Sequence, residues 1–539
     1  MNKKLVFIAD FFVDQVLGGG ELNSDELIKL LKEKGFDVEA VKSHTVELSF
    51  LKSRLNSFFI VSNFMGLSQE CKNWLIENAH YIIYEHDHKY LPARNPAQYD
   101  NFRAPQRDIR NFSFYKNAFK VVCQTQFHKN ILMDNLKLKN IVSFGGNLWS
   151  EGALQKIREL SQREKQKRCS IMDSPISHKN TTKARKYCSF HGLSYDLIAD
   201  ANYFLFLEKM SKNETLVFFP GTPETLSRLV CEARMMGMSV KTNGLVGAVK
   251  EEWFSKKGEA LIDYMMSKRK KIVNEITSYA SAPYDSIVMP KVSILSTYHD
   301  GSKFLEGFLD NIVEQTMFKE CELILVDANS QGNEQELVQA YQQQYKNIKY
   351  LRLDKPLKPT PCINIAIKES AGEYLALALI DDRKSQTNIE ELYSEIRRTP
   401  QVDLVYGDTA VSKKPNELFH ENDHTELAEH SKNGFSRENM IKCLPGPMPL
   451  WRRDAHDRYG FFDEDECDYA DDWEMWLRMV NGGAIFRKLD KIVGLYLNGG
   501  RSQQETREQR KEEARIFFKY SDVYGYNFVK YAPYFRQFV

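Results

Sequence analysis

Residues 374–380, Tyr-Leu-Ala-Leu-Ala-Leu-Ile, form a short apolar run that ends at the acidic pair Asp381-Asp382. Such a run is typical of a buried strand, and strands that alternate with helices along the chain indicate a parallel sheet. An acidic pair at a strand end can hold a divalent metal. The run therefore predicts an α/β fold with a polar site at one edge of a sheet.

A second acidic pair, Asp471-Asp472, lies in residues 469–478, Tyr-Ala-Asp-Asp-Trp-Glu-Met-Trp-Leu-Arg. It immediately precedes an amphipathic, aromatic-rich helix. Across a cleft from a metal, such a carboxylate can remove the proton of an acceptor hydroxyl. The two pairs together predict transfer of a group from a phosphate-bearing donor. The competing interpretations are a helix N-cap for Asp471-Asp472 and a turn or cap for Asp381-Asp382.

Size and composition describe an ordinary globular protein. The 539 residues are too many for one core, which indicates about two to four domains. The net charge of +1 gives no reason to expect a nucleic-acid or membrane partner, although a local basic patch stays open. Nine cysteines without a CxxC pair indicate reduced thiols, and the N-terminus lacks a signal-peptide pattern. We therefore expect a cytoplasmic protein without a transmembrane helix.

The order of strand-like and helix-like segments predicts three Rossmann-like α/β units. We expect an N-terminal lobe at 1–160, a short second lobe at 161–285, and a third domain with a helical C-terminal extension at 286–539. The clearest predicted strands are 5–12, 58–62, 81–85, 121–124, 215–220, 292–296 and 322–327.

Polar residues in the third domain follow the predicted strands. Thr297 and Tyr298 come after the first strand, and Asp327 ends the next. Ligands of open α/β sheets bind at the carboxyl ends of strands. We expect Tyr298 to lie against a nucleotide base, Asp327 to bond that base, and Asp381 with Asp382 to reach a metal on the diphosphate. The alternative for Asp327 is a turn former.

These residues carry a resemblance to family 2 glycosyltransferases, which have the GT-A fold. It covers about residues 290–510, and the matching pieces are 292–298, 324–327, 372–382, 448–452, 459–463 and 471–478. The resemblance implies inverting transfer from a nucleotide sugar, dependent on Mn²⁺ or Mg²⁺, with Asp472 as the general base. Two positions depart from the family pattern: Leu379 replaces the first Asp of an Asp-x-Asp, and only Asn364 remains of an Arg-Asn pair.

The N-terminal half carries a weaker set of signals. The glycines Gly18-Gly19-Gly20 lie between a strand and a helix, where the backbone can approach an anion. Further along, Glu224 and Glu232 are eight residues apart, which places both near one face of a predicted helix 224–236.

This pattern resembles the Glu-seven-residues-Glu element of family 4 glycosyltransferases, which have the GT-B fold. The resemblance covers about residues 1–280 and implies nucleotide-sugar binding by Gly19, Gly20, Lys179, Glu224 and Glu232, with possible retaining transfer. For residues 85–88, Glu-His-Asp-His, acceptor binding, a metal site and an ordinary polar loop all stay open.

We therefore expect a two-module glycosyltransferase that uses a nucleotide-sugar donor and a hydroxyl acceptor, most simply in glycan or polysaccharide synthesis. In one alternative, the N-terminal module is a non-catalytic acceptor-binding or scaffold domain. In another, the enzyme glycosylates hydroxymethylated bases in phage DNA. This last function would need a basic groove, which the net charge does not support.

Overall fold

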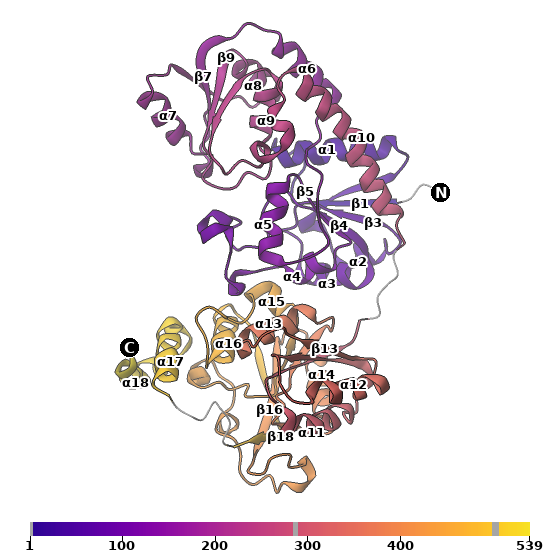
Figure 1. The fold of residues 1–539 in the computed structure, drawn as a ribbon, viewed down its shortest axis with the longest axis vertical. Helices are drawn as coiled ribbons and strands as arrows, with labels where there is room; N and C mark the ends of the chain where they lie inside the picture. The colour runs from indigo at the N-terminus through magenta and orange to yellow at the C-terminus, as the bar shows by residue number, and fades with distance from the viewer. Residues whose placement is uncertain (1–3, 284–288, 499–505) are drawn as a thin grey trace. The chain divides into compact units, whose positions relative to one another are not determined.

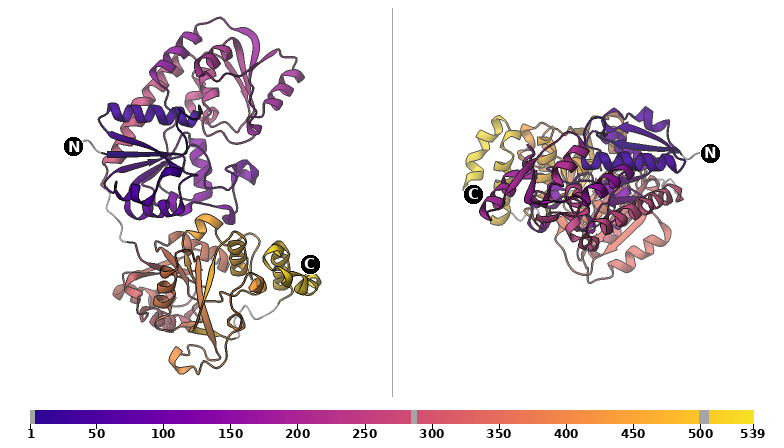
Figure 2. Two further views of the ribbon diagram at one scale, coloured as in Figure 1. Left: turned by 180° about the vertical axis from the view of Figure 1, so that it is seen from behind. Right: turned by 90° about the horizontal axis from the view of Figure 1, so that it is seen from above.

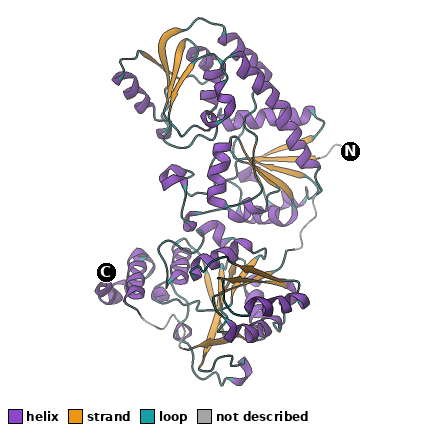
Figure 3. Cartoon of the chain, in the orientation of Figure 1, coloured by secondary structure: helices purple, strands orange, loops and turns teal. Residues whose placement is uncertain are grey.

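The computed structural model describes residues 4–283, 289–498 and 506–539 (Figure 1). The chain divides into two compact units. Unit 1 consists of residues 1–104 and 111–287, and unit 2 consists of residues 105–110 and 288–539. Both units combine sheets with covering helices, which confirms the α/β class (Figure 3).

The first lobe of unit 1 is built on a six-stranded parallel sheet in the order β2-β1-β3-β4-β5-β6. Its strands are β1 (Lys4–Ala9), β2 (Asp37–Lys42), β3 (Phe58–Val61), β4 (His80–Tyr84), β5 (Lys120–Cys123) and β6 (Ile141–Ser143). Its longer helices are α1 (Gly19–Glu33), α3 (Gln69–Asn78) and α5 (Gln126–Leu136). The inner strands β1, β3 and β4 are almost completely buried, as is typical of a parallel sheet covered on both faces, whereas the edge strand β2 is largely exposed.

The second lobe of unit 1 has a four-stranded parallel sheet in the order β10-β9-β7-β8. The strands are β7 (Gln166–Met172), β8 (Tyr195–Ile198), β9 (Asn213–Phe218) and β10 (Ser239–Thr242). Its helices are α6 (Glu151–Ser161), α7 (Thr181–Phe190), α8 (Tyr203–Met210) and α9 (Arg228–Met235). Helix α10 (Glu259–Ser281) then returns to the first lobe, where Ile272 and Ile276 share its core with Phe7.

Unit 2 contains an eight-stranded mixed sheet in the order β13-β12-β11-β14-β17-β16-β18-β15. The strands are β11 (Val292–Tyr298), β12 (Cys321–Asp327), β13 (Ile348–Arg352), β14 (Tyr374–Leu377), β15 (Arg383–Lys384), β16 (Leu404–Ser412), β17 (Leu450–Arg452) and β18 (Phe486–Leu497). The first four strands are parallel to one another, and β17 runs antiparallel to β14.

Helices complete unit 2 around this sheet. They include α11 (Ser302–Val313), α12 (Glu334–Gln344), α13 (Pro359–Glu369), α14 (Asn388–Arg398), α15 (Ala455–Tyr459), α16 (Asp471–Asn481), α17 (Arg507–Lys519) and α18 (Tyr526–Phe535). The C-terminal helices α17 and α18 pack on each other at the flank of the unit (Figure 2). In the described ranges, no helix combines the length and the apolar character needed to cross a bilayer.

Several predicted elements are wrong in their bounds, and the strand expected at 5–12, for example, ends at Ala9. The strand expected at 374–380 ends at Leu377, because the chain turns and the Asp382 amide donates to the Leu379 carbonyl oxygen. The helix expected from Glu224 begins only at Arg228. Residue 224 is extended instead and forms a parallel bridge with Val246. Glu224 and Glu232 are therefore not two turns of one helix.

Candidate functional site

The candidate donor side of unit 2 lies where neighbouring parallel strands end. Strands β12, β11 and β14 are adjacent in the sheet, so their carboxyl ends share one edge. At that edge Asp327 is fully buried and accepts hydrogen bonds from the Ser330 amide (2.7 Å) and the Tyr350 hydroxyl (2.6 Å). These contacts fit the turn-former interpretation of Asp327, and its bond to a base stays a prediction.

The two residues at the end of β11, Thr297 and Tyr298, point to opposite faces of the sheet. Tyr298 is only 6% exposed and packs in the hydrophobic core of unit 2. The ring is thus largely covered by neighbouring side chains, and its contact with a base stays a prediction. Thr297, whose side chain points to the opposite face of the strand, is half-buried.

The acidic pair after β14 is largely withdrawn from water. Asp382 is 4% exposed, and its Oδ1 accepts a hydrogen bond from the Leu497 amide (3.0 Å), whereas its Oδ2 has no partner. Burial, reinforced by the neighbouring charge of Asp381, raises the pKa of Asp382 to about 8. Burial also raises the pKa of Asp381. Both carboxylates would therefore be stabilised by a cation.

Two basic residues next to this pair were missed from the sequence. The Arg383 guanidinium is buried and donates to the Ile380 (2.9 Å) and Phe304 (3.2 Å) carbonyl oxygens, so it holds the turn. The Lys384 ammonium is buried without a hydrogen-bond partner, and burial lowers its pKa to about 7. No sequence signal predicted their burial, because Lys and Arg after a strand are usually exposed.

The residues present suit a metal that takes most of its ligands from the donor. Among residues 4–283, 289–498 and 506–539, no group of three or more His, Cys, Asp and Glu side chains is placed to share a metal. Mg²⁺ is usually bound by one or two carboxylates together with substrate phosphates and water. Asp381 and the unpartnered Asp382 oxygen meet that modest requirement.

The second acidic pair forms the first two residues of α16. Asp471 accepts a hydrogen bond from the Thr360 hydroxyl (2.8 Å). Asp472 accepts one from the Cys443 thiol (3.2 Å) and one from the Trp473 amide (2.7 Å). The N-cap position belongs to Ala470, so neither aspartate is the N-cap. Burial raises the pKa of both carboxyls, and their mutual repulsion adds to the effect at Asp471.

Helix α17 supports the start of α16 through one glutamate. Glu512 accepts hydrogen bonds from the Asp468 (2.8 Å), Tyr469 (2.9 Å) and Ala470 (2.7 Å) amides. These amides precede the helix, so Glu512 fixes the direction in which the chain enters α16. Nothing in the spacing of the sequence pairs residue 512 with this loop.

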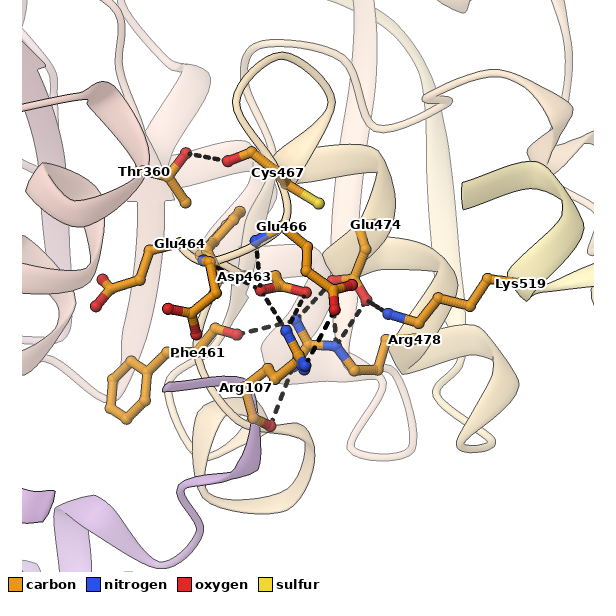
Figure 4. A network of polar contacts seen from close by, with 12 residues as sticks. Arg107, Thr360, Phe461, Asp463, Glu464, Glu466, Cys467, Glu474, Arg478 and Lys519 are labelled. Atoms are coloured by element: carbon orange, nitrogen blue, oxygen red, sulfur yellow. Dashed lines mark hydrogen bonds and ion pairs between the residues drawn. The ribbon is translucent and has the colours of Figure 1, made fainter. Parts of the chain in front are cut away.

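Glu474, one turn into α16, is also held by partners that the sequence did not reveal. It accepts hydrogen bonds from Arg478 (2.8 Å) and Lys519 (3.0 Å) (Figure 4). It accepts a third from the Tyr520 hydroxyl (2.5 Å). Burial opposes its ionisation, but the two cations and the hydroxyl outweigh it and hold the pKa of Glu474 at about 2. This carboxylate is a fixed structural anion, unlike Asp471 and Asp472.

Unit 1 contains a cavity of about 810 Å³ between its two lobes. All five N-terminal residues predicted to bind a nucleotide sugar line it, namely Gly19, Gly20, Lys179, Glu224 and Glu232. Gly19 and Gly20 are the first residues of α1, where free backbone amides favour an anion. The structure therefore brings these residues together, although Glu224 lies outside the helix expected for it.

The two glutamates of this cavity already have protein partners. Glu224 pairs with the Lys179 ammonium (2.7 Å). Glu232 is 3% exposed and accepts hydrogen bonds from the Trp149 indole (3.0 Å) and the Tyr203 hydroxyl (2.6 Å). Glu232 thus ties α9 to the rest of the lobe and presents little free carboxylate to the cavity.

The segment Glu85-His86-Asp87-His88 does not form a metal site in the described part of the chain. Glu85 is buried and bonded to Lys89 and to the Tyr115 hydroxyl. His86 lines the cavity, and burial lowers its pKa to about 3, so its ring is neutral. A neutral imidazole at the wall suits polar contacts to an acceptor, which stays a prediction.

Comparison with known proteins finds a family match within unit 2. Residues 293–460 match the model of Glycosyl transferase family 2. An uncharacterised glycosyltransferase of Methanocaldococcus jannaschii is 25% identical over 119 residues, which are 22% of this chain and 41% of that protein. Glycosyltransferase GlyG of Streptococcus pneumoniae serotype 4 is 27% identical over 116 residues, 22% of this chain and 38% of that protein. The chain thus spans about two fifths of the length of these curated relatives.

Two solved structures are similar at a low level. S. aureus TarS 1-349 is 16% identical with a TM-score of 0.36, and the match covers 44% of this chain and 70% of that chain. Mannosyltransferase PcManGT from Pyrobaculum calidifontis is 16% identical with a TM-score of 0.34, covering 46% and 70%. The family match and the named relatives support a glycosyltransferase whose family 2 region lies in unit 2.

Proposed function

We propose that this chain transfers a sugar from a nucleotide-sugar donor to a hydroxyl of a glycan or polysaccharide, and that unit 2 does so with inversion and a divalent metal. One observation carries the proposal. In the unit that contains the family match, a buried and a half-buried aspartate lie at the strand-end edge, and a half-buried acidic pair begins a helix. The first pair suits a metal ion that binds the donor diphosphate, and the second pair suits the role of proton acceptor.

The transfer is a direct displacement at the anomeric carbon. The acceptor oxygen forms a bond to that carbon while the bond to the diphosphate oxygen breaks, and the leaving diphosphate takes the electron pair. The hydroxyl proton passes to the Asp472 carboxylate. Burial raises the pKa of Asp472, which makes it a stronger base than an exposed aspartate.

The neighbours of Asp472 give it a defined orientation. The Trp473 amide bonds Oδ1, and the Cys443 thiol bonds Oδ2 from a separate segment. Thr360 holds Asp471 in a different direction, so the two adjacent carboxylates have separate roles. We assign proton transfer to Asp472 and electrostatic support to Asp471.

Asp381 and Asp382 would hold the metal. When bound, Mn²⁺ or Mg²⁺ would neutralise the charge that develops on the diphosphate. Asp382 orients toward the β18 backbone through its bond to Leu497, which leaves its second oxygen for the ligand side.

For unit 1 we propose binding of a phosphorylated donor in the cavity, near Lys179, Glu224 and the glycines that begin α1. The size of the cavity, the lysine and the helix N-terminus support binding. Glu232 is held by Trp149 and Tyr203, which favours a binding or scaffold role for this unit over retaining transfer.

Asp381→Ala should abolish metal-dependent nucleotide binding and leave the fold intact, because it removes the less buried member of the metal pair. Calorimetry with UDP-GlcNAc and GDP-mannose, with Mn²⁺ and with a chelator, measures this. Glu314→Ala removes an exposed carboxylate from the same unit and should change nothing. Unchanged metal-dependent affinity of Asp381→Ala would reject this metal assignment.

Asp472→Asn should lower kcat by roughly 10²–10⁴-fold with little change in donor affinity, because an amide cannot accept the proton. In the wild type, kcat/KM should fall on acidification at a higher pH than for an ordinary aspartate, since the base must be ionised and burial raises its pKa. Asp471→Asn is the matched control and should lose less. Greater sensitivity of Asp471 would make it the base, and insensitivity of both would refute the mechanism.

Lys179→Ala combined with Glu224→Gln should remove nucleotide-sugar binding that persists in chelator, and should spare the transfer by unit 2. Calorimetry in an Asp381→Ala background isolates this binding. Lys186→Ala, an exposed lysine on α7, is the control. If the background protein binds no nucleotide sugar in chelator, the donor site is rejected and the scaffold role remains.

A further inference from the structure

Unit 2 includes six residues from the N-terminal half of the chain. Residues 105–110 belong to it, although the residues before and after them belong to unit 1. Within this segment the Arg107 guanidinium donates to both oxygens of Asp463, at 2.7 and 2.9 Å, and reaches Glu466 at 3.4 Å (Figure 4). The sequence separation from Arg107 to Asp463 is 356 residues, and the family match covers neither residue.

Arg107 supplies the positive charge that compensates the buried Asp463 carboxylate. That carboxylate is 1% exposed, and in the described residues Arg107 is the cation paired with it. The Asp465 (3.3 Å) and Glu466 (3.2 Å) amides also donate to its Oδ1. A buried carboxylate that loses its cation is strongly destabilised. The ion pair therefore holds the chain of residues 463–466 in one conformation.

The backbone of the same segment packs against the start of this loop. Gly460 has a φ of +84°, and a Cβ there would lie 1.9 Å from the Arg107 carbonyl oxygen. The Phe461 amide donates to the Gln106 carbonyl oxygen (3.3 Å). A side chain at position 460 would therefore collide with the segment, so only glycine allows this close approach.

The loop is also tied to α16, the helix that begins with the proposed base. Arg478 of α16 donates to the Tyr459 (2.6 Å) and Phe461 (2.9 Å) carbonyl oxygens. At the other end of the loop, Thr360 donates weakly to the Cys467 carbonyl oxygen (3.5 Å) and more strongly to Asp471 (2.8 Å). A shift of the loop at Asp463 would therefore disturb its contacts with Arg478 and with Thr360, and both contacts lead to the acidic pair at the start of α16.

We infer that Arg107 is a positioning residue for the transfer reaction, supplied to the acceptor side of unit 2 by the N-terminal half of the chain. It does not touch the reacting atoms. It acts through Asp463 and loop 460–470 on the placement of Asp471 and Asp472. The family 2 region is therefore incomplete without residues 105–110. This inference rests on the proposed function of Asp472.

The test uses full-length protein with four changes: Arg107→Ala, Arg107→Lys, Asp463→Asn and the double variant Arg107→Ala/Asp463→Asn. A misplacement of about 1 Å costs up to about 10²-fold in rate. We expect Arg107→Ala to lower kcat by roughly 10–100-fold with the donor KM unchanged, because the donor edge of the sheet is untouched. Arg107→Lys should recover part of the loss, since it restores the charge but not the several contacts.

The double variant separates positioning from a general loss of structure. Asp463→Asn removes the unpaired buried charge, so the double variant should be more active and melt higher than Arg107→Ala alone. Arg103→Ala is the matched control, because Arg103 is exposed, precedes the segment and pairs with Asp134 in unit 1. It should match the wild type.

The outcomes distinguish the inference from the function on which it rests. A folded Arg107→Ala variant with wild-type kcat would overturn the inference, and so would a loss of donor affinity equal to the loss of kcat. Independent effects of Arg107→Ala and Asp463→Asn on thermal unfolding would also overturn it. The wild type could transfer no sugar while Arg107→Ala and Asp463→Asn still have non-additive effects on thermal unfolding. In that case the proposed function fails, but the ion pair between Arg107 and Asp463 is confirmed.

Discussion

A carboxylate removed from water costs several kcal/mol unless a cation or hydrogen-bond donors replace the water. Unit 2 contains two kinds of buried carboxylate that differ in this respect. Asp463 and Glu474 have cations beside them, Arg107 for the first and Arg478 with Lys519 for the second. Asp382, Asp471 and Asp472 have no described cation within ion-pair distance, and burial raises the pKa of each. The paired carboxylates hold the scaffold, and the unpaired ones are available for chemistry.

This division follows the architecture of the unit. Parallel strands β12, β11 and β14 end at one edge of the sheet, where backbone groups and acidic side chains meet a ligand. The proposed base begins α16, which follows loop 460–470 in the chain. That loop is held by Arg107 on one side and by Glu512 of α17 on the other. The proposed reaction centre is thus supported by contacts from residues outside the family 2 match.

The sequence predicted the α/β class because its short apolar runs and helical patterns alternate, and both signals are local. It singled out the two acidic pairs as candidate site residues because adjacent carboxylates next to apolar segments are unusual, and their roles stay predictions. It failed where local and tertiary preferences compete. Glu224 lies in a bridge to Val246, a pairing that no helical pattern reveals. Arg107 could not be predicted, because its partner is 356 residues away.

The central claim is that sugar transfer in unit 2 is a single displacement assisted by Asp472. The anomeric configuration of the product tests it most directly. Proton NMR of the reaction, run with the Lys179→Ala/Glu224→Gln protein so that unit 1 cannot contribute, reports that configuration. The account predicts that the new glycosidic bond has the opposite anomeric configuration to the donor. A product that retains the donor's configuration would contradict it, because one direct attack by an acceptor hydroxyl cannot retain it.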